Sequence, residues 1–342
     1  MRKIGEQIDQ LTTIEMGYQF GSESVLAKLY ESARKTAGDA PLSLYTADRL
    51  MRALGARDVV IITTGFMCPP LMGENDGPPG AAVLARALSL AFDVTPVLVT
   101  EQQIVDVLFA ACRGAGMNVY DLELSKRAKR TVAIEAFPMD KQKAKERSET
   151  LVSDLNPSAI ISVERPGRNE KGEYHYLSGS NITPVVAKVD YLFEEALSRG
   201  ILTIGIGDGG NELGLGKIKE TVKQYVPTGK KCKCPCEGGI AADIAADIPV
   251  IAGISNWGCY GLAAALSAIT GMHDVLHTGA IERRILGKCA DAGAVNGHTW
   301  ATETAVDGIS EDIHVYMVEM LRTIVEKGRV EKKPGESVRK SV

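Results

Sequence analysis

Two kinds of hydrophobic pattern alternate along most of the chain. Short apolar runs rich in β-branched residues and bounded by turn-forming residues are typical of buried parallel strands. Such runs lie at 58–66, 96–100, 132–137, 159–164, 202–208 and 249–254. The intervening segments have the period of amphipathic helices, at 80–92, 102–115, 141–155, 186–199, 260–270 and 280–291. Two further helices are expected at 22–37 and 311–327.

This alternation of strands and helices predicts a doubly wound α/β fold. Its mainly parallel sheet would carry helices on both faces, joined by right-handed crossovers, as in Rossmann-like three-layer sandwiches. Because no internal repeat or low-complexity linker divides the chain, we expect one domain over residues 1–342. That domain would begin with a helical lead-in at 1–39, contain a small insertion near 165–185, and end in a polar, loose tail at about 329–342.

Composition narrows the classes of function. The 342 residues are 45% hydrophobic, which is enough for a full core, and the net charge is −4 with no long basic stripe. We therefore expect no nucleic-acid partner, because phosphate backbones require clustered Lys and Arg. The N-terminus is amphipathic and acidic without an apolar signal region, and no apolar run approaches the roughly 20 residues of a membrane span. Together with the odd number of cysteines, seven, these features predict a cytoplasmic protein with free thiols. We expect no membrane partner, and the sequence is compatible with a homo-oligomer.

Acidic residues cluster where predicted strands end. Ligands of such sheets bind at the carboxyl ends of the strands, and acids follow four of the six. Each acid alone could be a helix cap. Five converging carboxylates would repel one another and bind protons or a cation, and oxygen ligands without His or Cys favour Mn²⁺ or Mg²⁺ over zinc. The five candidate ligands are Glu74, Asp76, Glu164, Asp208 and Glu212.

The stretch at 205–216, GIGDGGNELGLG, contains a G-x-G-x-x-G match. A dinucleotide fingerprint should follow the first strand of its unit and precede a second strand about 20 residues later. Here it follows a late strand, and the segment about 20 residues further is not a strand, so no nucleotide cofactor is expected. Gly209 and Gly210 would instead turn the backbone so that Asp208 and Glu212 face the crevice, with both glycines near the substrate.

Two further segments have open interpretations. Ser255 and Asn256 stand between a predicted strand and a helix, so they could cap the helix or expose its amides to an anionic carboxylate or phosphate. Cys232, Cys234 and Cys236 alternate among lysines. Zinc sites usually use C-x-x-C pairs, and no fourth ligand is apparent nearby, so this segment is interpreted as an exposed loop or as a redox-sensitive or adventitious metal-binding loop.

Three stretches carry a family resemblance: GENDGPPGAAVLARAL at 73–88, GDGGNELGLG at 207–216 and SNWGCYGLAAAL at 255–266. They resemble the D-glutamate cyclase-like C-terminal domain family over about residues 40–325. The resemblance implies conversion of D-glutamate to 5-oxo-D-proline and water with a divalent metal, usually manganese. It places the acidic motif residues on the five acids above, with Asp243 as a weaker sixth. The sequence departs from the family pattern at Cys259, where a second glycine is usual, and in the CKCPC segment.

The chemistry of lactam formation suits these residues. A carboxylate-bound Mn²⁺ can polarise the γ-carboxyl group of glutamate, and Glu164 or Glu212 could take the ammonium proton. Asn211 is a further catalytic candidate beside them. Arg165 or Arg168 could bind the substrate α-carboxylate or could form loop salt bridges. The same acids would also serve a Mn²⁺- or Mg²⁺-dependent phosphatase acting on small phosphate-containing metabolites, and a non-catalytic, metal-containing regulatory protein is a third alternative.

Overall fold

A parallel seven-stranded sheet forms the centre of the computed structural model, which describes residues 1–16 and 24–329. The strands are β1 (Val59–Thr64), β4 (Thr95–Thr100), β5 (Asn118–Val119), β6 (Thr131–Ala136), β7 (Ala159–Val163), β8 (Leu202–Gly207) and β9 (Ile248–Ile251). A separate antiparallel pair, β2 (Met67–Cys68) with β3 (Met72–Gly73), follows β1. The tail predicted at about 329–342 lies almost wholly outside the described residues.

The strand order is β5-β6-β4-β1-β7-β8-β9. The chain builds outward from β1 through β4 to β6, then crosses back and builds in the other direction from β7 to β9. Apart from the short edge strand β5, this is the doubly wound order 3-2-1-4-5-6, in which ligands bind where the winding direction reverses. That point lies between β1 and β7, which pair directly from Val60 with Ala159 to Thr64 with Val163.

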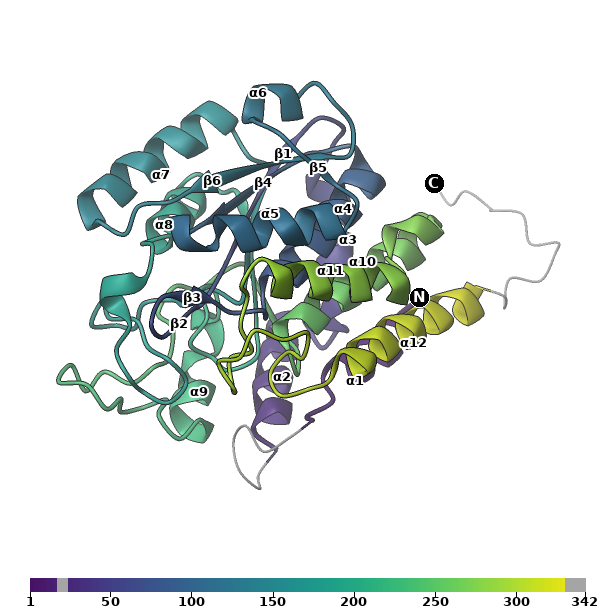
Figure 1. The fold of residues 1–342 in the computed structure, drawn as a ribbon. Helices are drawn as coiled ribbons and strands as arrows, with labels where there is room; N and C mark the ends of the chain where they lie inside the picture. The colour runs from purple at the N-terminus through teal and green to yellow at the C-terminus, as the bar shows by residue number, and fades with distance from the viewer. Residues whose placement is uncertain (17–23, 330–342) are drawn as a thin grey trace.

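Helices cover both faces of the sheet (Figure 1). They are α1 (Arg2–Thr12), α2 (Val25–Thr36), α3 (Leu42–Ala53), α4 (Pro78–Phe92), α5 (Val105–Gly114), α6 (Leu122–Ser125), α7 (Lys141–Leu155), α8 (Asp190–Ser198), α9 (Lys219–Tyr225), α10 (Ser255–Thr270), α11 (Gly279–Asp291) and α12 (Glu311–Arg329). Short 3₁₀ turns lie at Gln102–Ile104, Thr183–Val185, Gly216–Ile218 and His273–Val275. The fold class predicted from the hydrophobic pattern is therefore confirmed.

Alternation along the strands divides the core between the two faces. In β1, Val60 and Ile62 face a large cluster with α1, α3, α4, α5, α10, α11 and α12. The intervening Val59 and Ile61 face a second cluster with α7 and α8. A third cluster joins α2 and α9 to Ile251 of β9. All six predicted strands are present; five are buried along their whole length and β6 only over its first three residues. Burial gives each strand the apolar run that identifies it.

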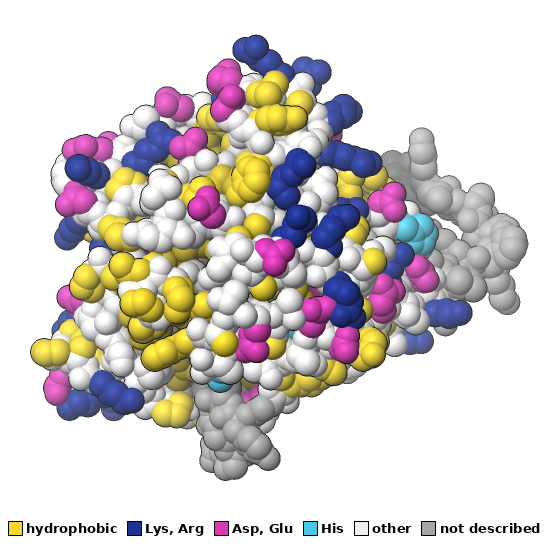
Figure 2. All heavy atoms as spheres, in the orientation of Figure 1, with side chains coloured by type: hydrophobic (Ala, Val, Ile, Leu, Met, Phe, Trp, Pro, Cys, Tyr) yellow, Lys and Arg dark blue, Asp and Glu magenta, His cyan; other side chains and the backbone are white. Residues whose placement is uncertain are grey.

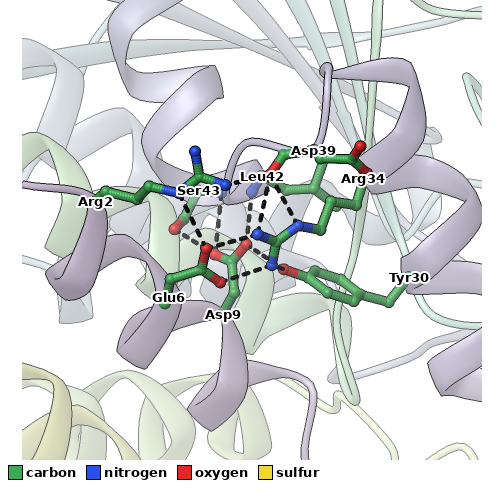
Figure 3. Close-up of polar contacts among 8 residues, drawn as sticks. All are labelled: Arg2, Glu6, Asp9, Tyr30, Arg34, Asp39, Leu42 and Ser43. Atoms are coloured by element: carbon green, nitrogen blue, oxygen red, sulfur yellow. Dashed lines mark hydrogen bonds and ion pairs between the residues drawn. The ribbon is translucent and has the colours of Figure 1, made fainter.

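Helix α3 was not predicted from the sequence, and its N-terminus shows why. The buried carboxylate of Asp9, in α1, accepts hydrogen bonds from the amides of Leu42 and Ser43 at 2.5 and 3.1 Å (Figure 3). Tyr30 of α2 donates to the same carboxylate at 2.7 Å. The capping side chain is thus remote in sequence, where a local Ser, Asp or Asn would have signalled a helix start.

The surface of the described residues is mixed in charge. Figure 2 shows basic and acidic side chains interspersed over the visible face. In residues 1–16 and 24–329, every helix is too short or too polar to cross a membrane.

Candidate active site

A pocket of about 690 Å³ lies at the carboxyl ends of β1, β7 and β8, beside the point where the winding of the sheet reverses. Acidic residues from four segments line it, and aromatic residues form much of the remaining wall. The lining acids are Glu74, Glu164, Asp208 and Asp307. Among the described residues that line the pocket there is no lysine or arginine. The location follows from the strand order, and several acids without a Lys or Arg partner are unusual among buried residues.

The segment after β3 supplies Glu74 and Asp76. The carboxylate of Asp76 accepts hydrogen bonds from the amides of Ser255 and Asn256 at 3.0 and 2.9 Å, at the N-terminus of α10. Burial raises the pKa of Asp76 well above its usual range, the charge of Asp307 raises it further, and the amide hydrogen bonds only partly offset these effects. Burial, with Asp307 and Asp76 as the nearest charges, also raises the pKa of Glu74 well above normal.

Glu164 follows β7 directly and has a backbone φ of 39°, an uncommon conformation for a residue with a side chain. The hydroxyl of Ser255 donates a 2.6 Å hydrogen bond to its Oε2, which fixes the orientation of the carboxylate. Gly77 leaves the space that this arrangement needs, because a Cβ there would lie 3.0 Å from that of Glu164. Burial and then the charge of Asp208 raise the pKa of Glu164 well above its usual range.

Asp208 and Glu212 belong to the glycine-rich turn after β8, but their surroundings differ. The carboxylate of Glu212 accepts hydrogen bonds from the amides of Asp208, Gly209 and Gly210 at 2.9, 2.6 and 2.6 Å. The glycines thus wrap the backbone around Glu212, which is fully buried and does not line the pocket, whereas the sequence interpretation had both acids facing the crevice. Asp208 lines the pocket, and burial followed by the charge of Glu212 raises its pKa well above normal.

Asp307, in the loop between α11 and α12, was missed by sequence reasoning. Burial raises its pKa to about 6, although the imidazole of His298, with Nδ1 3.8 Å from Oδ1, lowers it in part. Asp307 precedes Gly308 in a turn with a backbone φ of 51°, and an Asp-Gly pair in a loop ordinarily indicates only a turn. No pattern near it in the chain indicates that this turn folds over the sheet.

Two groups of carboxylate oxygens are close enough to share a cation. Oxygens of Asp76, Asp208 and Asp307 lie within 4.8 Å of one another, and so do oxygens of Glu164, Asp208 and Glu212. Asp208 is common to both groups, and Glu74 faces the same pocket. An all-oxygen donor set with no neutralising Lys or Arg in the pocket lining suits a hard divalent ion such as Mn²⁺ or Mg²⁺.

Several candidate residues lie elsewhere or have other partners. Arg165 is fully buried and forms an ion pair with Glu101, which follows β4; its Nη2 lies 2.6 Å from Glu101 Oε1. Its Nη1 also donates to the carbonyl of Gly65 and its Nη2 to that of Ala187, at 3.1 and 2.8 Å. Arg165 therefore joins the loops after β1, β4 and β7, and its two terminal nitrogens donate to these loops instead of to a substrate in the pocket.

Arg168 and Asp243 also point away from the pocket. Arg168 pairs with Glu194 of α8 and covers the ring of Tyr191, with its guanidinium carbon 5.2 Å from the ring centre. Asp243 pairs with Lys219 at 2.9 Å on a partly exposed surface. Neither residue is therefore brought to the acidic cluster, in contrast to the expectation from the sequence.

Ser255 and Asn256, the candidates at the N-terminus of α10, form hydrogen bonds with the segment that leads into α4. The side-chain oxygen of Asn256 accepts from the amides of Gly77 and Gly80 at 3.1 and 2.6 Å, which joins α10 to the start of α4. Because Asp76 accepts from the Ser255 and Asn256 amides, these amides are directed at a protein carboxylate instead of at a substrate anion. Asn211 lines the pocket and donates to the carbonyl of His175 at 2.9 Å.

Fold and site together define a doubly wound α/β protein with a carboxylate-lined crevice at its switch point. Comparison with known proteins places it more closely. The sequence model of the family described as "D-glutamate cyclase-like, C-terminal" matches residues 21–322, so the chain belongs to this family and the resemblance drawn from the three motifs is confirmed. One relative is the human protein "D-glutamate cyclase, mitochondrial", 31% identical over 289 residues that cover 79% of this chain. The chain spans only 42% of that relative's length.

Proposed function

We propose that this chain converts D-glutamate to 5-oxo-D-proline and water in the acidic pocket, with Mn²⁺ or Mg²⁺ as its metal. The observation that carries the proposal is the convergence of buried carboxylates with no Lys or Arg in the described pocket lining, in a member of the D-glutamate cyclase-like family. A relative that is named for this activity supports the substrate. The small anionic metabolite expected from the sequence would then be D-glutamate itself.

The metal would be held by the two overlapping carboxylate groups, one of Asp76, Asp208 and Asp307 and one of Glu164, Asp208 and Glu212. When bound, a divalent ion would polarise the γ-carboxyl group of the substrate as a Lewis acid. It would also offset the repulsion among these acids, which otherwise favours their protonated forms. The number of ions is an outcome for metal analysis.

The reaction forms a bond between the α-nitrogen and the carbon of the γ-carboxyl group (Cδ) and breaks one bond from that carbon to oxygen. The ammonium group carries three hydrogens; one stays on the lactam nitrogen and two leave with the oxygen as water. A group that accepts a proton from the ammonium and returns it to the departing oxygen would serve both steps. We assign this role to Glu164, because its carboxylate lies in the pocket lining within the acidic cluster and Ser255 holds its Oε2 in place.

Glu212 and Asn211 receive different roles in this proposal. Glu212 already accepts three amide hydrogen bonds, so we assign it to holding the turn and presenting Asp208. Asn211 fixes one wall of the pocket through the carbonyl of His175. Apart from the oxygen that Glu212 offers to the metal, both residues would therefore be positioning residues, whereas the sequence hypothesis made them catalytic.

A phosphatase acting on small phosphate-containing metabolites is the competing function. The two clusters of carboxylates have Asp208 in common. Such an arrangement would also hold a pair of metal ions that activate water and neutralise the charge of a phosphate. The absence of Lys and Arg from the described lining of the pocket favours the cyclase, because phosphate sites commonly add such cations.

The deciding experiment offers the purified chain and Mn²⁺ to D-glutamate, to L-glutamate and to phosphate monoesters in parallel. We expect oxoproline from D-glutamate, no phosphate release, and loss of product when Mn²⁺ is omitted. Phosphate release without oxoproline would replace the cyclase with the phosphatase. Stoichiometric Mn²⁺ binding without either product would support the non-catalytic alternative.

A further inference from the structure

Three cysteines and one histidine converge beside the acidic pocket but outside its lining. The sulfurs of Cys232, Cys234 and Cys236 are separated by 3.5 Å (Cys232–Cys234), 3.3 Å (Cys232–Cys236) and 3.2 Å (Cys234–Cys236). His175 directs its Nε2 at them, 3.2 Å from the sulfur of Cys234 and 3.7 Å from that of Cys236. All four potential ligand atoms lie within 4.8 Å of one another.

These separations have the size of a metal coordination shell. With metal–sulfur bonds of about 2.3 Å and a metal–nitrogen bond of about 2.0 Å, the edges of a tetrahedron are roughly 3.5–3.8 Å. A disulfide would require sulfurs about 2.05 Å apart, and all seven cysteines are free thiols. The observed separations of 3.2–3.7 Å are up to about 0.6 Å shorter than these edges, and three sulfurs with one imidazole nitrogen are the donor set of a structural zinc site.

Groups around the cluster suit thiolate ligands. The side-chain amides of Asn169 and Asn181 lie 3.6 and 3.8 Å from the sulfurs of Cys236 and Cys234, and the Gly238 amide donates to Cys236 at 3.5 Å. N–H donors of this kind orient metal-bound sulfurs and stabilise their charge. Three thiolates with one divalent ion carry a net charge of −1, and Lys230, Lys231 and Lys233 lie in the same segment.

The cluster is also closed as structural sites are. His175 is 1% exposed and Cys232 is 4% exposed, while Cys234 and Cys236 are half-buried. A ring of four protein ligands leaves no open position for substrate, which distinguishes a structural from a catalytic zinc site.

We propose that His175, Cys232, Cys234 and Cys236 bind one Zn²⁺ ion that joins two loops at the wall of the candidate active site. His175 belongs to the loop between β7 and α8, and the cysteines belong to the loop between α9 and β9. The same loops are already in contact, since the Lys233 amide donates to the carbonyl of Gly179 at 2.9 Å and the Thr228 hydroxyl to that of Leu177 at 2.6 Å.

The bound zinc has a consequence for the pocket. Tyr176, Leu177 and Ser178, which follow His175 directly, line the pocket. Asn211 donates to the carbonyl of His175 from the opposite side. Zinc therefore fixes the wall formed by residues 176–178, independently of the ions that the carboxylates hold.

The fourth ligand explains why the sequence left this segment open. Cys-x-Cys-x-Cys offers three ligands without the usual C-x-x-C spacing, and His175 lies 59 residues before Cys234. The fold brings the histidine to the sulfurs and so supplies the fourth ligand that the sequence did not reveal.

Metal analysis of the purified full chain tests the proposal directly. We expect one equivalent of zinc per chain without added zinc. Replacement of zinc by Co²⁺ should give the thiolate-to-cobalt charge-transfer band and the strong visible bands of a tetrahedral site. Cys234→Ser and His175→Ala should lose the zinc and the cobalt bands. Cys112→Ala, which removes a buried cysteine outside the cluster, and Asp208→Asn, which alters the acidic pocket, should retain both.

The cobalt spectrum of the unmutated chain keeps the test independent of whether the variants fold. Wild-type protein that binds neither zinc nor Co²⁺ at stoichiometric concentration would overturn the proposal. So would a disulfide among residues 232, 234 and 236 in protein purified without oxidant, detected by mass spectrometry, or retention of zinc by both ligand variants. Protein that forms no oxoproline but still contains its zinc would count against the proposed cyclase and not against the zinc site.

Discussion

Buried acids at the same edge of the sheet fall into two sets. One is Glu101, which has a cationic partner, and the other is the pocket acids, which face one another. Glu101, after β4, accepts hydrogen bonds from the guanidinium of Arg165 and, at 2.8 Å, from the amide of Ala187. Asp208, after β8, faces Glu212, Asp307 and Asp76, and these charges raise its pKa beyond the effect of burial. The position at a strand end is shared, but the electrostatic environments are opposite.

This difference separates an acid that holds the fold together from the acids to which we assign the chemistry. A buried carboxylate with a buried cationic partner is compensated within the protein, and it joins the loops that its partner contacts. Buried carboxylates that face one another destabilise the folded chain until protons or a cation bind them. Proteins tolerate such strain at functional sites at the expense of stability. The two sets should therefore respond in opposite ways to neutral, isosteric substitutions.

The largest effect on stability is expected for Glu101→Gln. It leaves the buried guanidinium of Arg165 without a negative partner, which costs about 3–5 kcal/mol in the free energy of unfolding. Chemical denaturation followed by circular dichroism measures the loss. Replacing both partners, as Glu101→Gln with Arg165→Met, is the control, because a neutral pair of similar volume removes the uncompensated charge. A Glu101→Gln variant as stable as the parent would contradict the compensated pair.

Asp208→Asn is expected to act in the opposite direction on stability. Removing one of several mutually repelling charges should stabilise the Mn²⁺-free protein by about 0.5–2 kcal/mol. Oxoproline formation should fall more than about 100-fold, because changes to the partners of metal ligands already cost 10–100-fold. Isothermal titration with Mn²⁺ and thermal unfolding measure the two effects. Destabilisation together with unchanged Mn²⁺ affinity would remove Asp208 from the metal site.

The fold was largely predictable from the sequence, and the site only in part. Buried strands produce continuous apolar runs, so the six strands and the acids that follow them could be identified from neighbouring residues. The partner of each acid could not be identified in this way. Whether Glu101 or Asp208 has a cationic neighbour depends on Arg165, which follows a third strand, and this contact arises only when the loops pack together.

The missed residues share the same physical cause. Asp307 lies in a loop after α11, and His175 lies in the loop between β7 and α8, so each reaches its cluster through tertiary packing. Asp9 caps α3 from another helix in the same way. Local sequence patterns report on burial and backbone propensity, whereas these contacts join segments that are remote in the chain.

The free energy of unfolding should change with pH by about 1–3 kcal/mol, and this change tests the mutual repulsion of the pocket acids. Asp307 has its pKa raised to about 6, and those of Glu74, Asp76, Glu164 and Asp208 are raised well above normal. The folded state therefore holds protons that the unfolded chain releases near pH 4. The stability from these groups is complete below about pH 4 and is lost as pH rises through 6 and above.

Thermal unfolding at several pH values, without Mn²⁺ and with saturating Mn²⁺, measures this dependence. Added Mn²⁺ should stabilise most at high pH, where it binds the deprotonated carboxylates, and little near pH 5. The difference between the parent and Asp208→Asn isolates the pocket from surface acids such as Glu6, whose pKa a hydrogen bond from Arg34 lowers. A parent–variant difference that does not change with pH would contradict the mutual repulsion of the pocket acids.

The smallest effect is expected for Asp243→Asn. Asp243 was the weakest of the acidic candidates in the sequence, and its carboxylate pairs with Lys219 at 2.9 Å, with both side chains about a third exposed. Exposed pairs contribute roughly 0–1 kcal/mol, so the free energy of unfolding should change by no more than about 1 kcal/mol. Mn²⁺ affinity and oxoproline formation should stay within about twofold of the parent. Kinetics and titration under the conditions used for Asp208→Asn measure all three. If Asp243→Asn instead abolished Mn²⁺ binding, the 241–247 loop would have to close over the pocket on metal binding, and the division between the two sets of acids would need to be redrawn.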